Sequence, residues 1–353
     1  MKKTLLAILA TVAIVACSND EIVREAAPEA IGFDNAFVNN STRSVVTPGY
    51  STTNLFEDFA VYGFVEDAVL FNGTKVAKDG SVSNGELDQV WKYKDTQYWI
   101  AGANYDFYAV APYSGNWTIK DATTPASTGA QISFTNVDGT QDLLYSGIVE
   151  RNGATNDYAA VAFTFKHILS RVKFSFKNGY NASAATICVR DIKITNAYAT
   201  GVATLDANAA TWGDQAGAIA AGVAFGNATT EATYATDATE ANLVNYDYAY
   251  SNIVESYYER LLIPGKKEWT ISFVVDLLVS DKKIASYPHT AKATIDLAPG
   301  MSYDILAEIT ATNIDPNHAQ EPIEFTATMT NWTDATGETG ATVDTIQQGN
   351  QNN

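Results

Sequence analysis

The side chains best suited to catalysis or metal binding are few in this chain and stand far apart. Its 353 residues include three histidines, His167, His289 and His318, and two cysteines, Cys17 and Cys188. Metal centres and nucleophile–base pairs use such groups in clusters, and no zinc-protease, nucleophile-elbow, P-loop or dinucleotide-binding pattern occurs. We therefore expect no catalytic residue, no metal, no cofactor and no enzymatic activity. A glycosidase-like carboxylate pair stays open, because 40 acidic residues do not reveal which two lie close together.

Cys17 is the one of these residues whose position along the chain indicates a reaction. A basic start precedes an apolar run, Leu5–Val15, that is too short to span a bilayer but typical of a signal peptide. The run continues into Ala16 and Cys17, and the four residues 14–17 resemble a bacterial lipobox. We expect cleavage between Ala16 and Cys17 to remove residues 1–16, and acylation of Cys17 to anchor the protein. The alternative is an ordinary signal peptide followed by a chance cysteine.

The composition indicates a folded, strand-rich and acidic protein. Apolar residues make up 46% of the chain, enough for a sizeable core, and 19 Tyr and 15 Phe favour strands. The formal net charge of −18 disfavours nucleic acid as a partner and electrostatic attachment to anionic lipid. The only membrane contact that we expect is through the lipid on Cys17. Cys188 then has no cysteine partner in the exported chain and is expected to be a small buried apolar residue.

Residues 17–43 form the first unit behind the signal peptide. A polar tether leads to a short alternating segment whose apolar side chains share one face of a strand: Ile31, Phe33 and Phe37. A second polar stretch, which we expect to be exposed, follows and contains Arg43. Exposed polar segments are where proteases cut.

The rest of the chain is predicted to form two β domains, 44–160 and 161–353, the second with a polar and mobile C-terminal tail. The boundary lies close to a change in alternation, because apolar residues share one parity over 161–165 and the other from Ile168 onwards. Since side chains alternate across a strand, this change predicts a bulge, a bend or a strand that moves to another sheet. We expect an all-β protein with two β-sandwiches in tandem.

Aromatic residues crowd the segment from Trp91 to Tyr108, and two interpretations compete. Aromatic faces stack on sugars, so an exposed cluster would form a carbohydrate platform. The alternation at Tyr105 and Phe107 places one face inward, which favours the core of an aromatic-rich sandwich. His167, a lone histidine within a strand, is similarly expected to be a core or sheet-edge residue rather than a ligand.

Five segments follow one another behind the lipobox and carry a family resemblance. They are Tyr-Asp-Phe-Tyr-Ala-Val-Ala-Pro at 105–112, Asp-Leu-Leu-Tyr at 142–145, the run 165–174 around His167, residues 261–271, and Leu-Ala-Pro-Gly-Met-Ser-Tyr at 297–303. In this order they resemble the fimbrillin family of Bacteroidales, the subunits of type V pili. The acidic stretch at 18–21 also resembles the surface-export signal of Bacteroidetes lipoproteins, with a solvated tether as the alternative.

This resemblance covers nearly the whole chain and implies a fold and a mechanism of assembly. The fold would be two transthyretin-like, Greek-key β-sandwiches in tandem. Such pilins reach the cell surface as outer-membrane lipoproteins, and an Arg-specific surface protease then removes the N-terminal segment with its first strand. The matching cut follows Arg43 and makes Ser44 the new N-terminus, whereas a cut at Arg24 would leave the first strand attached. The vacated groove accepts a strand from another pilin subunit, and a fimbrium grows.

A segment near the C-terminus repeats the apolar spacing of the removable strand. It presents four apolar side chains at a two-residue period: Ile323, Phe325, Ala327 and Met329. A replacement strand must fill the same pockets at the same period, so 323–329 is our candidate donor strand. The alternative is that 323–329 is only the last strand of its own domain.

A removable strand and a candidate donor together predict a stalk subunit of a cell-surface fimbria that serves adhesion. A tip subunit, which needs a groove but no donor and can carry loops for a host or bacterial surface ligand, stays open. The alternative from another class is a surface lipoprotein that binds glycans and never polymerises. Such a protein would keep Cys17 and residues 18–43, and would expose its aromatic cluster.

Overall fold

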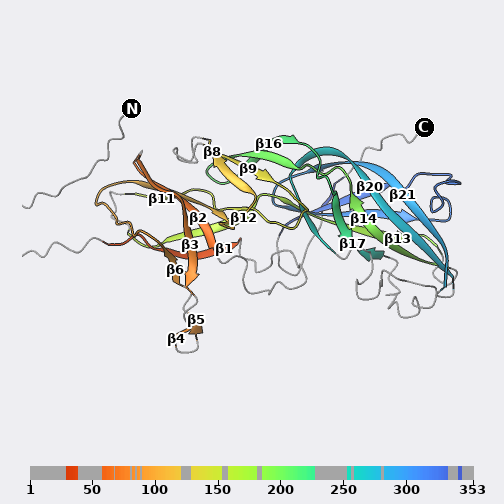
Figure 1. The fold of residues 1–353 in the computed structure, drawn as a ribbon, viewed down its shortest axis with the longest axis horizontal. Coiled ribbons are helices and arrows are strands. Elements are labelled where there is room, and N and C mark those ends of the chain that lie inside the picture. Colours follow the sequence, from red (N-terminus) through yellow and green to blue (C-terminus); the bar gives the residue numbers. More distant parts are fainter. Residues whose placement is uncertain are drawn as a thin grey trace, which may run out of the picture.

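The computed structural model of the protein describes residues 29–38, 58–66, 68–79, 82–83, 86–87, 90–120, 129–152, 158–180, 185–226, 253–255, 258–279, 282–332 and 341–343. Every regular element in these ranges is a β-strand, which confirms the predicted all-β class. No helix in the same ranges has the length and hydropathy needed to cross a membrane. The sheets follow one another along the long axis of the molecule (Figure 1).

The first sheet has eight strands and closes on itself. Its members are β1 (Phe33–Val38), β2 (Asp58–Val65), β3 (Ala68–Asp79), β6 (Val90–Tyr93), β7 (Tyr105–Ala111), β10 (Leu144–Tyr145), β11 (Val149–Arg151) and β12 (Val161–His167). The strand order is β10-β12-β1-β6-β3-β2-β7-β11, and β10 also pairs with β7. Seven strands therefore form a closed ring, in which β1 is the link between β12 and β6. Aromatic side chains that are at most 2% exposed fill its interior, among them Phe59, Phe71, Phe107 and Phe163.

Two sheets at the other end of the molecule pack on a second core (Figure 1). One contains β13 (Ser170–Asn178), β18 (Ile253–Glu255), β19 (Arg260–Leu262), β22 (Met301–Ile309), β23 (Phe325–Asn331) and β24 (Ala341–Val343). Its order is β18-β13-β22-β23-β24, and β19 also pairs with β13. The other has the order β17-β14-β20-β21, with β14 (Thr186–Ile194), β17 (Val223–Gly226), β20 (Gly265–Val279) and β21 (Lys282–Leu297). Alternating burial along β20 and β22 supplies apolar side chains to the space between them.

A fourth sheet lies between these two ends and draws strands from both halves of the chain (Figure 1). Its order is β16-β15-β9-β8, with β8 (Trp117–Lys120), β9 (Gln131–Thr135), β15 (Thr200–Leu205) and β16 (Ala210–Ala216). The pairing of β15 with β9 joins segments on opposite sides of the domain boundary expected at 160. The remaining strands, β4 (Val82–Ser83) and β5 (Glu86–Leu87), pair only with each other.

The change in alternation near residue 165 marks a change of sheet, one of the outcomes that it predicted. Side chains of β12 alternate between buried and exposed, and this strand pairs with β1 and β10 in the first sheet. Only residues 168–169 separate β12 from β13, which pairs with β22 in the six-stranded sheet. The chain thus leaves the first sheet after His167, seven residues beyond 160. Cys188 is buried in β14, as expected.

Candidate functional site

β1 lies between β12 and β6 in the closed ring of strands. We call this position the β1 slot. β1 runs parallel to β12, with Phe33 opposite Val161 and Val38 opposite Phe165, and the register shifts between Asp34 and Phe37. On its other side, Phe33 pairs antiparallel with one residue of β6. The predicted strand at 31–37 is therefore confirmed as a strand, and its removal would open the ring between β12 and β6.

The Phe33 side chain fills an aromatic pocket inside the closed ring of strands. It is 5% exposed, and its ring lies 5.3–6.5 Å, centroid to centroid, from five other rings: Phe59, Phe71, Tyr93, Phe107 and Phe163. Ile31, two residues earlier, is 1% exposed. Each large apolar side chain buried in this way stabilises the bound strand by about 1.5–3 kcal/mol. The pocket therefore holds β1 in addition to its pairing with β12.

The candidate donor strand lies in a sheet of its own domain. β23 pairs with β22 on one side and with β24 on the other. Phe325 is 3% exposed and lies edge-to-face against Phe174, Phe176 and Phe273, while Met329 is half-buried. Ile323 and Ala327 are also buried. In this conformation 323–329 is an intradomain segment, so a donor role requires it to leave its sheet.

The aromatic cluster belongs to the core. Trp91, Trp99, Tyr105 and Phe107 are each at most 8% exposed, and in this segment Tyr98 stands out as 50% exposed. The core interpretation is therefore confirmed for these residues. A carbohydrate platform built on the same side chains would need them on the surface.

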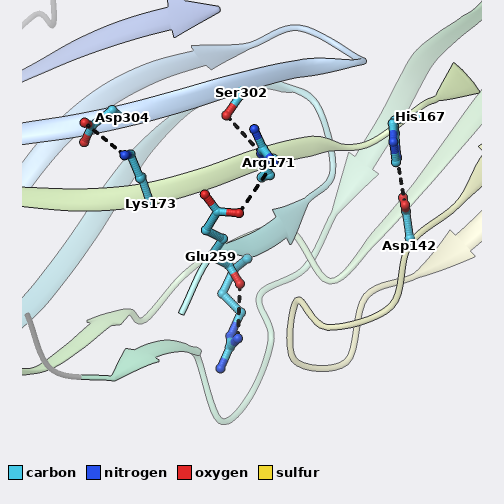
Figure 2. Close-up of polar contacts among 8 residues, drawn as sticks. Asp142, His167, Arg171, Lys173, Glu259, Ser302 and Asp304 are labelled. Atoms are coloured by element: carbon cyan, nitrogen blue, oxygen red, sulfur yellow. Dashed lines mark hydrogen bonds and ion pairs between the residues drawn. The ribbon is translucent and has the colours of Figure 1, made fainter. Parts of the chain in front are cut away.

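His167 is the last residue of β12, just before the chain enters β13 of the six-stranded sheet (Figure 2). Its Nδ1 is 2.7 Å from a carboxylate oxygen of Asp142, and its ring stacks on Trp332 at a centroid distance of 3.5 Å. Trp332 directly follows β23, and its amide donates to the carbonyl of Gly300. His167 is buried, which confirms the expected core position. The stack ties the end of β23 to the end of β12. No local pattern could predict it, because the two residues are 165 positions apart.

Charged side chains cross from β13 to its neighbours beside this junction (Figure 2). Arg171 lies 3.6 Å from a carboxylate oxygen of Glu259 and donates to the Ser302 hydroxyl at 3.1 Å. Lys173 lies 3.6 Å from Asp304 on β22. Pairs that are partly exposed add little to stability, but they favour this register of two parallel strands. Within the described ranges no cluster of three metal-binding side chains occurs.

Four predicted processing residues, Ala16, Cys17, Arg43 and Ser44, lie outside the described residues, as does the side chain of Phe37. Lipidation and both cleavages therefore stay predictions.

Comparison with known proteins identifies the family. A family model described as fimbrillin-like matches residues 42–332. The chain belongs to the fimbrillin-like family. A fimbrial protein from Bacteroides vulgatus has a similar fold, with a TM-score of 0.56 and 14% sequence identity over 86% of this chain and 99% of that chain. No curated protein matches.

Other solved structures align over similar lengths. A putative cell adhesion protein from Bacteroides uniformis has a TM-score of 0.47 at 14% identity, covering 87% of this chain and 98% of its own. The fimbrial anchor protein Mfa2 from Porphyromonas gingivalis has a TM-score of 0.39 at 15% identity, covering 86% and 98%.

Membership in the family confirms the predicted resemblance and the coarse function. This fimbrillin is a subunit of cell-surface fimbriae or a related adhesion structure, and it associates with other fimbrial subunits. The family is structural and adhesive, and the protein is not an enzyme.

Proposed function

We propose that this fimbrillin is a stalk subunit that polymerises by donor-strand exchange after proteolysis. In this proposal the precursor is exported to the outer membrane as a lipoprotein acylated on Cys17, and an Arg-specific surface protease cuts between Arg43 and Ser44. The observation that carries the proposal is the β1 slot: β1 is the link between β12 and β6 in a closed ring. Arg43 follows the end of β1 by five residues, so a cut there detaches the whole strand.

The released slot would receive the C-terminal segment of another subunit, with 323–329 as donor. β23 and β24 are the last two strands of their sheet, so their departure leaves the β13–β22 pairing intact. The departing segment exchanges one aromatic pocket for another, because Phe325 leaves the rings around it and enters the pocket vacated by Phe33. A head-to-tail contact of this kind does not close on itself and builds a filament.

The first experiment determines the N-terminus and the intact mass of the protein taken from the cell surface. We expect a chain that begins at Ser44 and carries no lipid, in high-molecular-weight fibres. Replacing Arg43 with Ala should leave an acylated, monomeric precursor, whereas Arg24→Ala should change nothing. A wild-type surface protein that keeps the acylated Cys17 and residues 18–43 would contradict the proposal and indicate a pilus anchor or a glycan-binding lipoprotein.

A further inference from the structure

A loop holds the residues that precede β1. This loop, residues 97–99, lies within the connection between β6 and β7. The amide of Ile31 donates to the carbonyl of Gln97 at 2.9 Å, and the amide of Trp99 donates to the carbonyl of Glu29 at 3.0 Å. The first strand therefore continues beyond the β1 slot into a second main-chain site.

The Tyr93 side chain, on β6, ties this segment to the loop. Its hydroxyl donates to the carbonyl of Ile31 at 2.7 Å and accepts the amide of Gln97 at 3.1 Å. Its ring also packs against Phe33, 5.3 Å away. The Tyr93 side chain thus contacts both the Phe33 ring and the backbone of Ile31. If the strand slipped by one residue, the Phe33 side chain would point away from the aromatic pocket. The Ile31 carbonyl would also move away from the Tyr93 hydroxyl.

The middle residue of the held segment, Ala30, stands opposite Tyr98 in an antiparallel bridge. The two hydrogen bonds of this bridge are made by the residues on either side of Ala30. The bridge makes no use of the Ala30 amide. Proline, which has no amide hydrogen, is therefore compatible with this position.

The candidate donor carries the same five-residue pattern as the held segment. Residues 29–33 read Glu-Ala-Ile-Gly-Phe, and residues 321–325 read Glu-Pro-Ile-Glu-Phe. In both, the first two residues are exposed and the Ile and Phe are buried. The proline at 322 falls at the position whose amide the bridge does not use.

We propose that Tyr93 and loop 97–99 form a register clamp that seats residues 321–323 of a second copy of this chain in place of residues 29–31. This inference deepens the proposed function and rests on it. Proteolysis removes residues 29–31. The Tyr93 hydroxyl, the Gln97 carbonyl and the Trp99 amide then lose the hydrogen bonds that they make to this segment. The clamp contacts backbone as far as position 29, so an incoming strand must extend four residues beyond the slot to use it.

Cysteine crosslinking tests the register, because facing residues in such an antiparallel bridge lie within reach of a disulfide. In the uncut precursor, Ala30→Cys with Tyr98→Cys should crosslink within one chain and verifies the geometry. In fibres grown from cut protein, Tyr98→Cys with Pro322→Cys should crosslink neighbouring copies. The matched control, Tyr98→Cys with Glu324→Cys, moves the second cysteine two residues along the strand and should crosslink about tenfold less.

Removing a single hydroxyl tests Tyr93 as the positioning residue. Tyr93→Phe keeps the ring against Phe33, and its fibres should dissociate about five- to tenfold faster, as expected for one lost hydrogen bond. Tyr113→Phe, at an exposed side chain outside the clamp, should leave dissociation unchanged. Fibres of the Tyr98→Cys, Pro322→Cys protein that crosslink no more than those of the Tyr98→Cys, Glu324→Cys control would overturn the clamp and leave strand exchange standing. Cut wild-type protein that stays monomeric would overturn both.

Discussion

Replacing Phe33 with alanine tests whether the aromatic pocket holds β1 in place. Truncation of a phenylalanine in a packed core costs about 3–5 kcal/mol. The area estimate agrees, because about 150 Å² of ring surface at about 25 cal/mol per Å² gives about 4 kcal/mol. Phe33 is 5% exposed, so nearly all of this surface is buried. Since 1.36 kcal/mol is a factor of ten, the population with β1 released should rise by about a hundredfold or more.

Amide hydrogen exchange measures this release directly, in a precursor that carries Arg43→Ala and cannot be cut. The amide of Val161 donates to the carbonyl of Gly32 at 2.8 Å, so its protection reports on the first strand. We expect Phe33→Ala to lower the protection of Val161 by about a hundredfold. An amide in the second core, such as that of Ile305 in β22, should keep its protection.

The matched control deletes a ring of the same size at the other end of the molecule. Phe225 is fully buried, 4.8 Å from Phe174, and Phe225→Ala should weaken protection around Ile305 and spare Val161. If Phe33→Ala leaves Val161 as protected as before, β1 is not held by its pocket. If both variants lower both reporters equally, the strand does not open independently of the whole protein, and the reasoning fails.

Three further predictions concern the scaffold. Arg190→Met should lower the free energy of unfolding by about 3–5 kcal/mol, because it removes the guanidinium that lies 3.0 Å from the buried Asp276 carboxylate; Arg190→Met with Asp276→Leu should recover most of this loss in urea titrations. Burial lowers the pKa of His289 below its usual 6.5. The contribution of neutral His289 to stability is therefore complete above pH 6.5 and declines as the pH falls, because the unfolded chain takes up a proton first. His289→Gln should flatten the acid side of a plot of unfolding free energy against pH. Asn136 donates to the carbonyl of Leu261 at 2.8 Å and accepts a loop amide at 2.7 Å, so Asn136→Leu should cost about 2–4 kcal/mol, measured by urea or thermal unfolding.

The alternation of apolar and polar residues predicted the features that depend on the geometry of a single strand. The alternation of apolar residues identified the strand that contains Ile31 and Phe33, the burial of Trp91 and Phe107, and the change of sheet after His167. All of these follow from side chains that point to opposite faces of one strand. The family resemblance implied two sandwiches in tandem and a purpose for the N-terminal segment, and both stay predictions.

Pairing between distant strands could not be predicted in the same way. β1 pairs with β12 and β9 pairs with β15, and nothing in a single alternating segment names its neighbour. For this reason the sequence left open whether 323–329 is a donor or an intradomain strand. Because Phe325 is buried, a charge placed there should damage the core of its own domain.

The site was predicted only in part because some of it is backbone. The pattern around Phe33 was visible, but the role of loop 97–99 was not, since main-chain hydrogen bonds leave no residue-type signature. The available signal was the match between residues 29–33 and 321–325, which begins two residues before the apolar alternation. The hydroxyl of Tyr93 could not be told from those of the other tyrosines without the fold.

The short connection between β12 and β13 has a mechanical consequence. A strand seated in the β1 slot lies along β12, and after two residues the same backbone continues as β13, which pairs in parallel with β22 over eight positions. In a fibre joined by strand exchange, tension would pass along these strands and load their ladders in shear, with all hydrogen bonds stretched together. Such a subunit would transmit a pull from one joint to the next along paired strands, and the connection between β22 and the donor segment would carry it onward.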